Sequence, residues 1–359
     1  MTFRILALPG DGIGPEVVAV ARRVLEALAA PEDLALAWQE ALIGGAAIEA
    51  EGVPLPDATL EAALEADAVL LGAVGGPRWE GLPGVRRPEA GLLQLRRALE
   101  VFANLRPIRT RPALAGHTPL KPEVVAGTDM LFVRELTGGL YFGDKGRDRR
   151  GAYDLCRYET EEIERVVRLA ARLARERRGR LTLIDKANVL ETSRLWREVT
   201  RDLIAREFTD LDFEVLLVDA AAMLLIREPS RFDVIVTENL FGDILTDEAG
   251  VLAGSLGLVP SASLGGDTGP GLYEPIHGSA PDIAGRGIAN PIGMLESLAL
   301  MLDRSMRRPD LAARLSTAID RVLEAGILPA DLGGTATTAD IEEAVLAHLS
   351  LPAEPAAAG

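Results

Sequence analysis

Three aspartates have a spacing and surroundings that could hold a divalent cation. Asp243 and Asp247 lie four residues apart, so a helix would place both carboxylates on one face, about 5–6 Å apart. Asp219 lies within the apolar segment 215–226, and the neighbours of all three predict burial rather than an ordinary solvated helix face, which is the alternative. Carboxylates without neighbouring Cys or His suit a hard cation, so we expect Mg²⁺ or Mn²⁺.

Arginines that could bind carboxylates occur in three places. One predicted helix face carries four residues at helical spacing, namely Glu89, Leu92, Leu93 and Arg96. Arg106 precedes a proline, and Arg134 ends a predicted strand. An arginine is by default a surface residue, but at the end of an element its planar fork could bind a substrate carboxylate. Spacing alone leaves open whether these three arginines converge.

Lys186 is notable because 35 of the 38 basic residues are arginine. It follows a predicted strand, and ligands of open α/β sheets bind at the carboxyl ends of strands. It could form an ion pair with Asp185, or lose its proton and act as a base, which arginine cannot do; the scarcity of lysine favours the second role. Tyr141 lies in a glycine-rich segment and could donate a proton, and His277 lies in a loop typical of ligand contact.

Short apolar runs alternate with helical patterns, which indicates an α/β fold with helices packed over a sheet. Strands are predicted at 3–8, 68–71, 130–134, 181–185, 214–218 and 234–237. Helices are predicted at 15–30, 89–103, 161–178, 193–206, 292–306, 310–324 and 338–348. Two glycine-containing segments differ from this pattern: 138–158 predicts a projecting loop or hairpin arm, and 264–291 an irregular segment of a functional kind.

Composition limits the class of protein and its partners. At roughly 150 residues per domain, a chain of 359 residues predicts two domains. The net charge of −16 argues against nucleic acid and anionic membrane but not against a small anion. The single cysteine, Cys156, indicates a reducing, cytoplasmic setting. The first apolar run is too short for a signal peptide, and the longest uncharged run, 249–266, is a poor membrane span.

The segment 10–16, Gly-Asp-Gly-Ile-Gly-Pro-Glu, looks like a dinucleotide fingerprint but departs from it. The spacing G-x-G-x-x-G needs a glycine where this chain has Pro15. Proline is common at the first position of a helix. The pattern therefore favours a tight strand-to-helix turn near a ligand over a Rossmann site.

Taken together, these segments resemble the decarboxylating β-hydroxyacid dehydrogenases, the isocitrate/isopropylmalate dehydrogenase family. The resemblance covers most of the chain, in the segments 10–16, 72–77, 89–96, 103–107, 134–143, 185–189, 239–247, 254–264 and 274–291. It implies an isocitrate/isopropylmalate dehydrogenase-like fold in which two α/β domains share a large mixed sheet and the cofactor site is not of the Rossmann type. Residues 1–101 and 254–359 would form an NAD-binding first domain, and 102–253 a second domain with the dimer interface and an arm at about 138–158.

In this family NAD lies across the later glycine-rich loop. By this resemblance, the residues that would face NAD are Glu274, His277, Gly278, Ser279, Ala280, Asp282 and Asn290. A carboxylate at Asp282 would accept hydrogen bonds from the ribose hydroxyls of adenosine and would repel a 2′-phosphate. The resemblance therefore implies NAD rather than NADP.

The resemblance also implies roles for the charged residues. The malate carboxylates would be bound by Arg96, Arg106 and Arg134, and the divalent cation by Asp219, Asp243 and Asp247. Lys186 would accept the hydroxyl proton as hydride passes to NAD⁺, and Tyr141 would protonate the carbon that loses CO₂. Family members place the residues equivalent to Lys186 and Asp219 in the neighbouring subunit's site, so a homodimer with shared active sites is expected.

Two features favour an alkylmalate substrate. Leu92 and Leu93 would form an apolar wall for an isopropyl group, with Glu89 one helical turn away, where isocitrate-type members have a hydroxyl residue. Those members also carry Asn-Thr-Glu after the strand arginine, which segment 135–139 lacks. Both differences favour oxidative decarboxylation of 3-isopropylmalate to 2-oxoisocaproate, a step of leucine biosynthesis. D-malate, tartrate and, less favoured, homoisocitrate are the alternative substrates.

Three features depart from the family pattern: Glu238, Gly293 and the basic arm segment 144–150. None of them belongs to the expected catalytic set. A non-catalytic regulatory subunit is an alternative of another class, but the lysine, tyrosine and aspartates expected of an enzyme are all present. A simple anion-binding module would leave the three aspartates unexplained.

Overall fold

The computed structural model describes residues 2–266 and 269–350 and divides into two compact units. Among the described residues, the first unit consists of residues 2–99, 255–262 and 269–350, and the second of residues 100–254 and 263–266. Ten strands are assigned to one mixed sheet, which agrees with the α/β class expected from the sequence. That the first unit binds NAD and the second forms a dimer interface stays a prediction.

Parallel strands form the centre of the first unit. Their order is β2 (Leu36–Glu40), β1 (Phe3–Gly10), β3 (Ala68–Ala73) and β12 (Gly271–Pro275). Strands β3 and β12 are buried along their whole length, and Ala68 lies opposite both Ile5 and Gly271. Such burial explains why β3 is a continuous apolar run rather than an alternating one. A further strand, β11 (Pro260–Leu264), has residues in both units.

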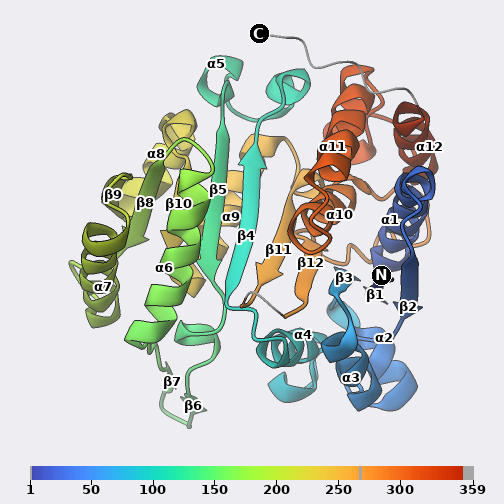
Figure 1. Cartoon of the computed structure of the whole chain (residues 1–359). Helices are drawn as coiled ribbons and strands as arrows, with labels where there is room; N and C mark the ends of the chain where they lie inside the picture. The colour runs from blue at the N-terminus through green and yellow to red at the C-terminus, as the bar shows by residue number, and fades with distance from the viewer. Residues whose placement is uncertain (1, 267–268, 351–359) are drawn as a thin grey trace. The chain divides into compact units, whose positions relative to one another are not determined.

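Seven helices are described in the first unit: α1 (Gly14–Ala29), α2 (Gly44–Glu51), α3 (Asp57–Glu65), α4 (Pro88–Ala98), α10 (Ile292–Arg304), α11 (Pro309–Glu324) and α12 (Thr338–Leu349). Helix α10 is buried over most of its length and contacts β12, α1 and α11 (Figure 1). Helix α12 begins with a capping box, in which the Thr337 hydroxyl and the Asp340 carboxylate bind each other's backbone N–H.

In the second unit, β4 (Ala103–Arg109) runs antiparallel to β5 (Asp129–Glu135). The parallel strands β10 (Val234–Thr237), β8 (Arg180–Asp185) and β9 (Asp212–Leu217) follow in that order. Thr237 lies opposite both Arg134 and Ile184, so β5, β10 and β8 end at one edge of this part of the sheet. The residues that follow these strands are therefore brought close together.

The helices of the second unit are α5 (Pro122–Val125), α6 (Thr160–Arg175), α7 (Glu191–Glu207), α8 (Val218–Arg227) and α9 (Asn239–Gly250). In Figure 1, α6 lies in front of β10, and α9 lies behind β5. The arm carries a two-stranded antiparallel hairpin, β6 (Lys145–Arg147) and β7 (Ala152–Asp154), which confirms the hairpin expected between residues 138 and 158.

Several predicted ends were wrong. Helix α4 ends at Ala98 rather than residue 103, because Ala103 begins β4, and Val218 begins α8 rather than ending a strand. Helix α6 ends at Arg175 rather than residue 178, and the carboxylates of Glu159 and Glu162 form its capping box. The structure also contains strands that were not predicted, among them β2, β4, β11 and β12. Within residues 2–266 and 269–350, no helix combines the length and apolar character needed to cross a bilayer.

Candidate functional site

Asp243 is the centre of a cluster of charged side chains in the second unit. It lies on the first half of α9, and its carboxylate accepts hydrogen bonds from Arg134 Nη1 and from the Tyr141 hydroxyl. Arg106 Nη2 lies 3.5 Å from the same carboxylate. The side chains of Arg106 and Arg134 are only 9% and 3% exposed. Two of the three predicted substrate arginines therefore do converge, together with the predicted proton donor.

Asp247 lies one turn further along the same face of α9, as the four-residue spacing predicts. Arg106 Nη1 lies 3.3 Å from its carboxylate and 2.6 Å from the Thr246 hydroxyl. The Asp247 side chain is 63% exposed and that of Asp243 is 31% exposed, so the expectation of burial was wrong for Asp247. Both carboxylates face guanidinium groups, which offsets the repulsion between two like charges on one helix face.

Tyr141 keeps its proton well above neutral pH in this setting. Burial raises the pKa of its phenol, and the Asp243 carboxylate that accepts its hydrogen bond raises it further. The Arg134 guanidinium lies 5.3 Å from the centre of the Tyr141 ring and opposes this shift. A phenol that stays protonated is suited to donate a proton rather than to accept one.

Lys186 follows β8 and pairs with Asp219 in the first turn of α8. This pairing lowers the pKa of the Asp219 carboxyl. The alternative in which Lys186 pairs with Asp185 is wrong, because Asp185 is occupied by a bidentate pair with Arg197 at 2.7 and 2.8 Å. The Asp219 side chain is 57% exposed, so the burial expected from its apolar neighbours was also wrong for this single chain.

Within residues 2–266 and 269–350, no three His, Cys, Asp or Glu side chains of one chain come together as a metal site. Asp243 and Asp247 share a helix face, whereas Asp219 is paired with Lys186 on another element. The family resemblance places Asp219 in the site of a neighbouring subunit, and that assignment stays a prediction. The oxygen-only character of the Asp243 and Asp247 pair fits a hard cation such as Mg²⁺ or Mn²⁺.

In the first unit, Arg96 and Glu274 form an ion pair. Arg96 Nη2 donates to Glu274 Oε1 at 2.7 Å, and the two side chains are 13% and 11% exposed. Arg96 Nε is buried and has no hydrogen-bond partner in the described part of the chain. On the same helix, Leu92 and Leu93 are half-buried, and Glu89 is exposed. The structure thus joins a predicted substrate ligand to a predicted NAD ligand.

The segment 277–282 of the predicted NAD loop is held against the turn at residues 10–16. The backbone N–H of Ile13 donates to the Ser279 carbonyl at 2.8 Å, and Ser279 is buried. At Gly12 the backbone has φ +58°, and a Cβ there would lie 1.9 Å from the Ser279 oxygen. Gly12 therefore permits a close approach of two backbone segments, and Ala280 has a positive φ of 37°. This arrangement agrees with a tight turn rather than a Rossmann cradle.

The remaining loop residues differ in exposure. Gly278 and Asp282 are exposed, and burial lowers the pKa of His277, which keeps its imidazole neutral at pH 7. His277 Nε2 is buried with no hydrogen-bond partner in the described ranges. The Asn290 amide donates to Asp331 at 3.0 Å, and its oxygen accepts from the Ile292 N–H at 3.0 Å. The Asn290 side chain is thus held by two hydrogen bonds, whereas Asp282 is exposed.

Comparison with known proteins identifies the family. Residues 4–345 match the model of the isocitrate/isopropylmalate dehydrogenase family. The chain belongs to this family. A relative from Carboxydothermus hydrogenoformans is 53% identical over 94% of this chain and 91% of its own length, and one from Anaeromyxobacter dehalogenans is 52% identical over 98% and 100%. Both are named 3-isopropylmalate dehydrogenase.

Solved structures of isocitrate/isopropylmalate dehydrogenase family members show the same fold. The isocitrate dehydrogenase of Methylococcus capsulatus is 37% identical, with a TM-score of 0.86 over 97% of this chain and 100% of that one. A β-decarboxylating dehydrogenase of Thermococcus kodakarensis is 36% identical, with a TM-score of 0.79 over 97% and 96%. These similarities confirm the fold expected from the sequence.

Two asparagines near the site were not predicted from the sequence. Asn104 Oδ1 accepts from Arg106 Nε at 2.8 Å, and Asn239 Oδ1 accepts from Arg134 Nε at 3.0 Å. Asn104 lies two residues from Arg106 on β4 and therefore shares its face, so prediction of this strand would have revealed it. Asn239 is 105 residues from Arg134, and no local pattern connects them.

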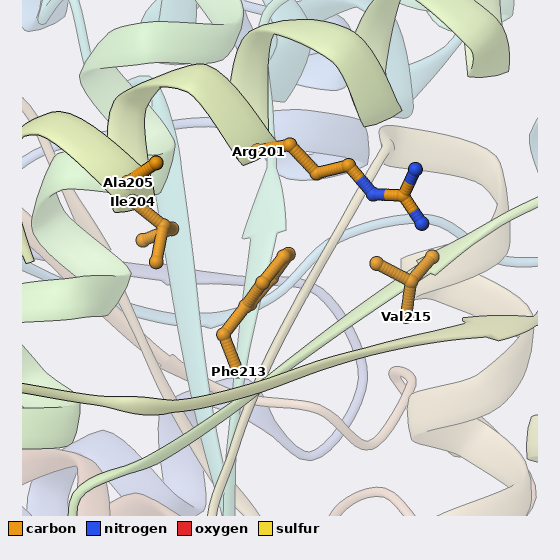
Figure 2. A pocket seen from close by; sticks show the side chains of 5 residues that line it. All are labelled: Arg201, Ile204, Ala205, Phe213 and Val215. Atoms are coloured by element: carbon orange, nitrogen blue, oxygen red, sulfur yellow. The ribbon is translucent and has the colours of Figure 1, made fainter. Parts of the chain in front are cut away.

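A separate cavity of about 430 Å³ lies between α7 and β9. Figure 2 shows its lining side chains, Arg201, Ile204, Ala205, Phe213 and Val215. It contains none of the residues predicted for substrate, metal or cofactor, and it lies beside the last strand of the sheet order. It is therefore not the candidate active site of this dehydrogenase family member.

Proposed function

We propose that this chain catalyses the NAD-dependent oxidative decarboxylation of 3-isopropylmalate to 2-oxoisocaproate, a step of leucine biosynthesis. The observation that carries the proposal is the convergence of Arg106, Arg134 and Tyr141 on Asp243. It is supported by relatives about half identical over nearly the whole chain that are named 3-isopropylmalate dehydrogenase. A biosynthetic enzyme with one half-buried cysteine also fits a cytoplasmic location.

The arginines would bind the two carboxylates of the substrate. Arg106 and Arg134 are buried and present guanidinium nitrogens beside the Asp243 carboxylate, where a dianion and a cation would meet. Arg96 would supply a further guanidinium, in exchange for part of its pairing with Glu274. A divalent metal bound by Asp243 and Asp247, with Asp219 of a second subunit, would polarise the C2 oxygen and stabilise the charge that develops on it.

Proton transfer would be divided between two side chains. Lys186 would accept the proton of the C2 hydroxyl as hydride leaves C2 for NAD⁺. Tyr141, whose raised pKa keeps it protonated, would donate its proton to the carbon from which CO₂ departs. Because Lys186 acts as the base and Tyr141 as the acid, the reaction needs an unprotonated lysine and a protonated tyrosine at the same pH.

The cofactor would lie on the loop of the first unit. The proposed NAD contacts are Glu274, His277, Gly278, Ser279, Ala280, Asp282 and Asn290. The exposed carboxylate of Asp282 is available to accept from the ribose hydroxyls and would repel a 2′-phosphate. Leu92 and Leu93, both half-buried on α4, would form the apolar wall for the isopropyl group, with Glu89 nearby. One such apolar contact is worth only about 1–3 kcal/mol, so other alkylmalates should also react.

The enzyme is proposed to act as a homodimer with shared sites. Exposed apolar side chains occur on α8, α9 and the arm, where Met223, Ile244 and Tyr153 are 64%, 58% and 62% exposed. Side chains of this kind are typical of an interface when they form a patch. The pair formed by the half-buried Lys186 and the exposed Asp219 is proposed to serve the partner's active site.

The test is a direct assay of the purified protein with NAD⁺, Mn²⁺ and isopropylmalate. We expect NADH and CO₂ in equal amounts, and a kcat/KM for isopropylmalate above those for D-malate, tartrate and isocitrate. Formation of NADH from another of these acids at a higher kcat/KM would replace the proposed substrate. Absence of NADH with all four, at high enzyme concentration, would favour the regulatory subunit.

A further inference from the structure

Glu238, which departs from the family pattern, is part of a buried network next to the catalytic cluster. It caps the N-terminus of α9: Glu238 Oε1 accepts from the Phe241 N–H at 2.7 Å. Its other oxygen accepts from the Tyr158 hydroxyl at 3.0 Å. Tyr158 and Glu238 are 5% and 7% exposed. A carboxylate at this end of a helix satisfies backbone N–H groups and is favoured by the helix dipole.

Asn239 connects this network to the catalytic side chains. Its backbone N–H donates to the Tyr158 hydroxyl at 3.0 Å. Its side-chain oxygen accepts from Arg134 Nε at 3.0 Å and from Arg134 Nη2 at 2.8 Å, and its amide nitrogen donates to the Gly138 carbonyl at 3.2 Å. Asn239 is fully buried, and both ends of its amide are used. An aspartate could accept from Arg134 but could not donate to Gly138.

The turn that contains Gly138 is also held by Glu135, at the end of β5. The buried Glu135 carboxylate accepts from the N–H groups of Thr137 and Gly138, each at 2.8 Å. A Cβ on Gly138 would lie 2.6 Å from the Tyr158 ring, so the turn packs directly on that ring. The short helix that carries Tyr141, Gly139–Tyr141, begins at the very next residue. The backbone before Tyr141 is therefore held at Gly138 by Glu135 and by Asn239.

We propose that Asn239 is a positioning residue that couples the substrate-binding Arg134 to the proton donor Tyr141, and that the Tyr158 and Glu238 pair holds Asn239 in place. This inference rests on the proposed function for the roles of Arg134 and Tyr141. Its geometric part, the fixing of the turn before Tyr141, does not depend on which acid is oxidised. The two parts can therefore be tested separately.

The decisive variant is Asn239→Asp, which preserves shape and the acceptor toward Arg134 but removes the donor to Gly138. We expect kcat to fall by about 10²-fold, because small displacements of a reacting group cost that much. In a Tyr141→Phe background the same substitution should change kcat by less than twofold. An equal loss in both backgrounds, or no loss in either, would overturn the proposal.

Two milder variants protect the test against misfolding. Tyr158→Phe retains the ring, which packs edge-on against Trp196 at 5.4 Å, and removes only the hydroxyl. We expect the kcat of Tyr158→Phe to fall about tenfold. Glu238→Gln can still cap the helix, so it should keep more than half of the activity that Glu238→Ala loses. The matched control is Tyr273→Phe, a buried tyrosine of the first unit whose hydroxyl lies 2.7 Å from Ser305 Oγ. A loss in this control as large as in Tyr158→Phe would contradict the assignment.

Hydrogen exchange separates failure of this inference from failure of the proposed function. In Asn239→Asp, the amides of residues 138–142 should exchange at least about tenfold faster than in the unaltered protein, while those of α12 should be unchanged. An inactive unaltered protein would refute the proposed function only. Unchanged exchange at residues 138–142 would refute the positioning role, whatever the activity.

Discussion

The two candidate sites are held together in different ways. In the second unit, side chains bind side chains: Asp243 accepts from Arg134 and Tyr141 and lies near Arg106. In the first unit, segment 277–282 of the predicted NAD loop is held through its backbone, where Ile13 donates to the Ser279 carbonyl. The first arrangement depends on charge and side-chain length, and the second on backbone approach. Conservative side-chain changes should therefore damage the second unit's site most.

Lys186→Arg should have the largest effect. Arginine can maintain an ion pair with Asp219, so the chain should fold, but it cannot release a proton near neutral pH. We expect kcat to fall by about 10³-fold or more, within the range for loss of a general base. Steady-state assays measure this, and Lys121→Arg, the same change at an exposed lysine, should leave kcat within twofold. Near-normal turnover of Lys186→Arg would remove this lysine from the mechanism.

Asp243→Asn should have the next largest effect. The amide is isosteric, but it removes the charge that faces two buried guanidinium groups and the proposed metal. We expect kcat/KM to fall by about 10²-fold and the Mn²⁺ concentration for half-maximal activity to rise at least tenfold. Titration with Mn²⁺ followed by NADH absorbance measures both.

The control for Asp243→Asn is Asp202→Asn, which removes an exposed carboxylate from α7. Its Mn²⁺ titration should match that of the unaltered protein. If Asp243→Asn loses activity with an unchanged Mn²⁺ requirement, then Asp243 serves only to orient Arg134 and Tyr141. The contrast between the two units would remain, but its cause would be hydrogen bonding rather than metal binding.

Sequence patterns predicted what depends on local spacing. Asp243 and Asp247 share a helix face because helical periodicity is a local property, and the apolar run of β3 is typical of a strand buried on both faces. Strand β4 was missed because it contains Arg106 and Pro107, and its polar residues are buried only because partners elsewhere satisfy them. Strand β12 was missed because it begins with a glycine, Gly271, and ends with a proline, Pro275.

Partner choice could not be predicted from spacing. The sequence gives no local sign that Asp185 pairs with Arg197 while its neighbour Lys186 pairs with Asp219. The packing of helices on the sheet decides such pairs. The predicted burial of Asp219 and Asp247 was wrong for a related reason. Both have apolar neighbours in sequence, yet each projects from a helix side that this single chain leaves open.

Asp282→Lys tests the charge of the first unit's loop. Because Asp282 is exposed, the change should not affect folding, and a positive charge should favour a 2′-phosphate over free ribose hydroxyls. We expect the ratio of kcat/KM for NAD⁺ to that for NADP⁺ to fall by about 10- to 50-fold, equivalent to about 1.4–2.3 kcal/mol. Glu61→Lys, the same charge change on the exposed side of α3, is the control. An unchanged ratio in Asp282→Lys would contradict the ribose contact.

Gly12→Ala should have the smallest effect. It tests whether the first unit's loop depends on the close backbone approach at Gly12. Alanine at φ +58° is strained, and its Cβ would also lie 1.9 Å from the Ser279 oxygen, so the loop must move. Gly52→Ala separates these causes, because Gly52 has φ +78° but open space around it. Both variants should lose about 1 kcal/mol of stability from strain. Only Gly12→Ala should raise the KM for NAD⁺, by about three- to tenfold, with the KM for isopropylmalate nearly unchanged. An equal rise in both would assign the effect to strain and would leave the turn at residues 10–16 without a part in cofactor binding.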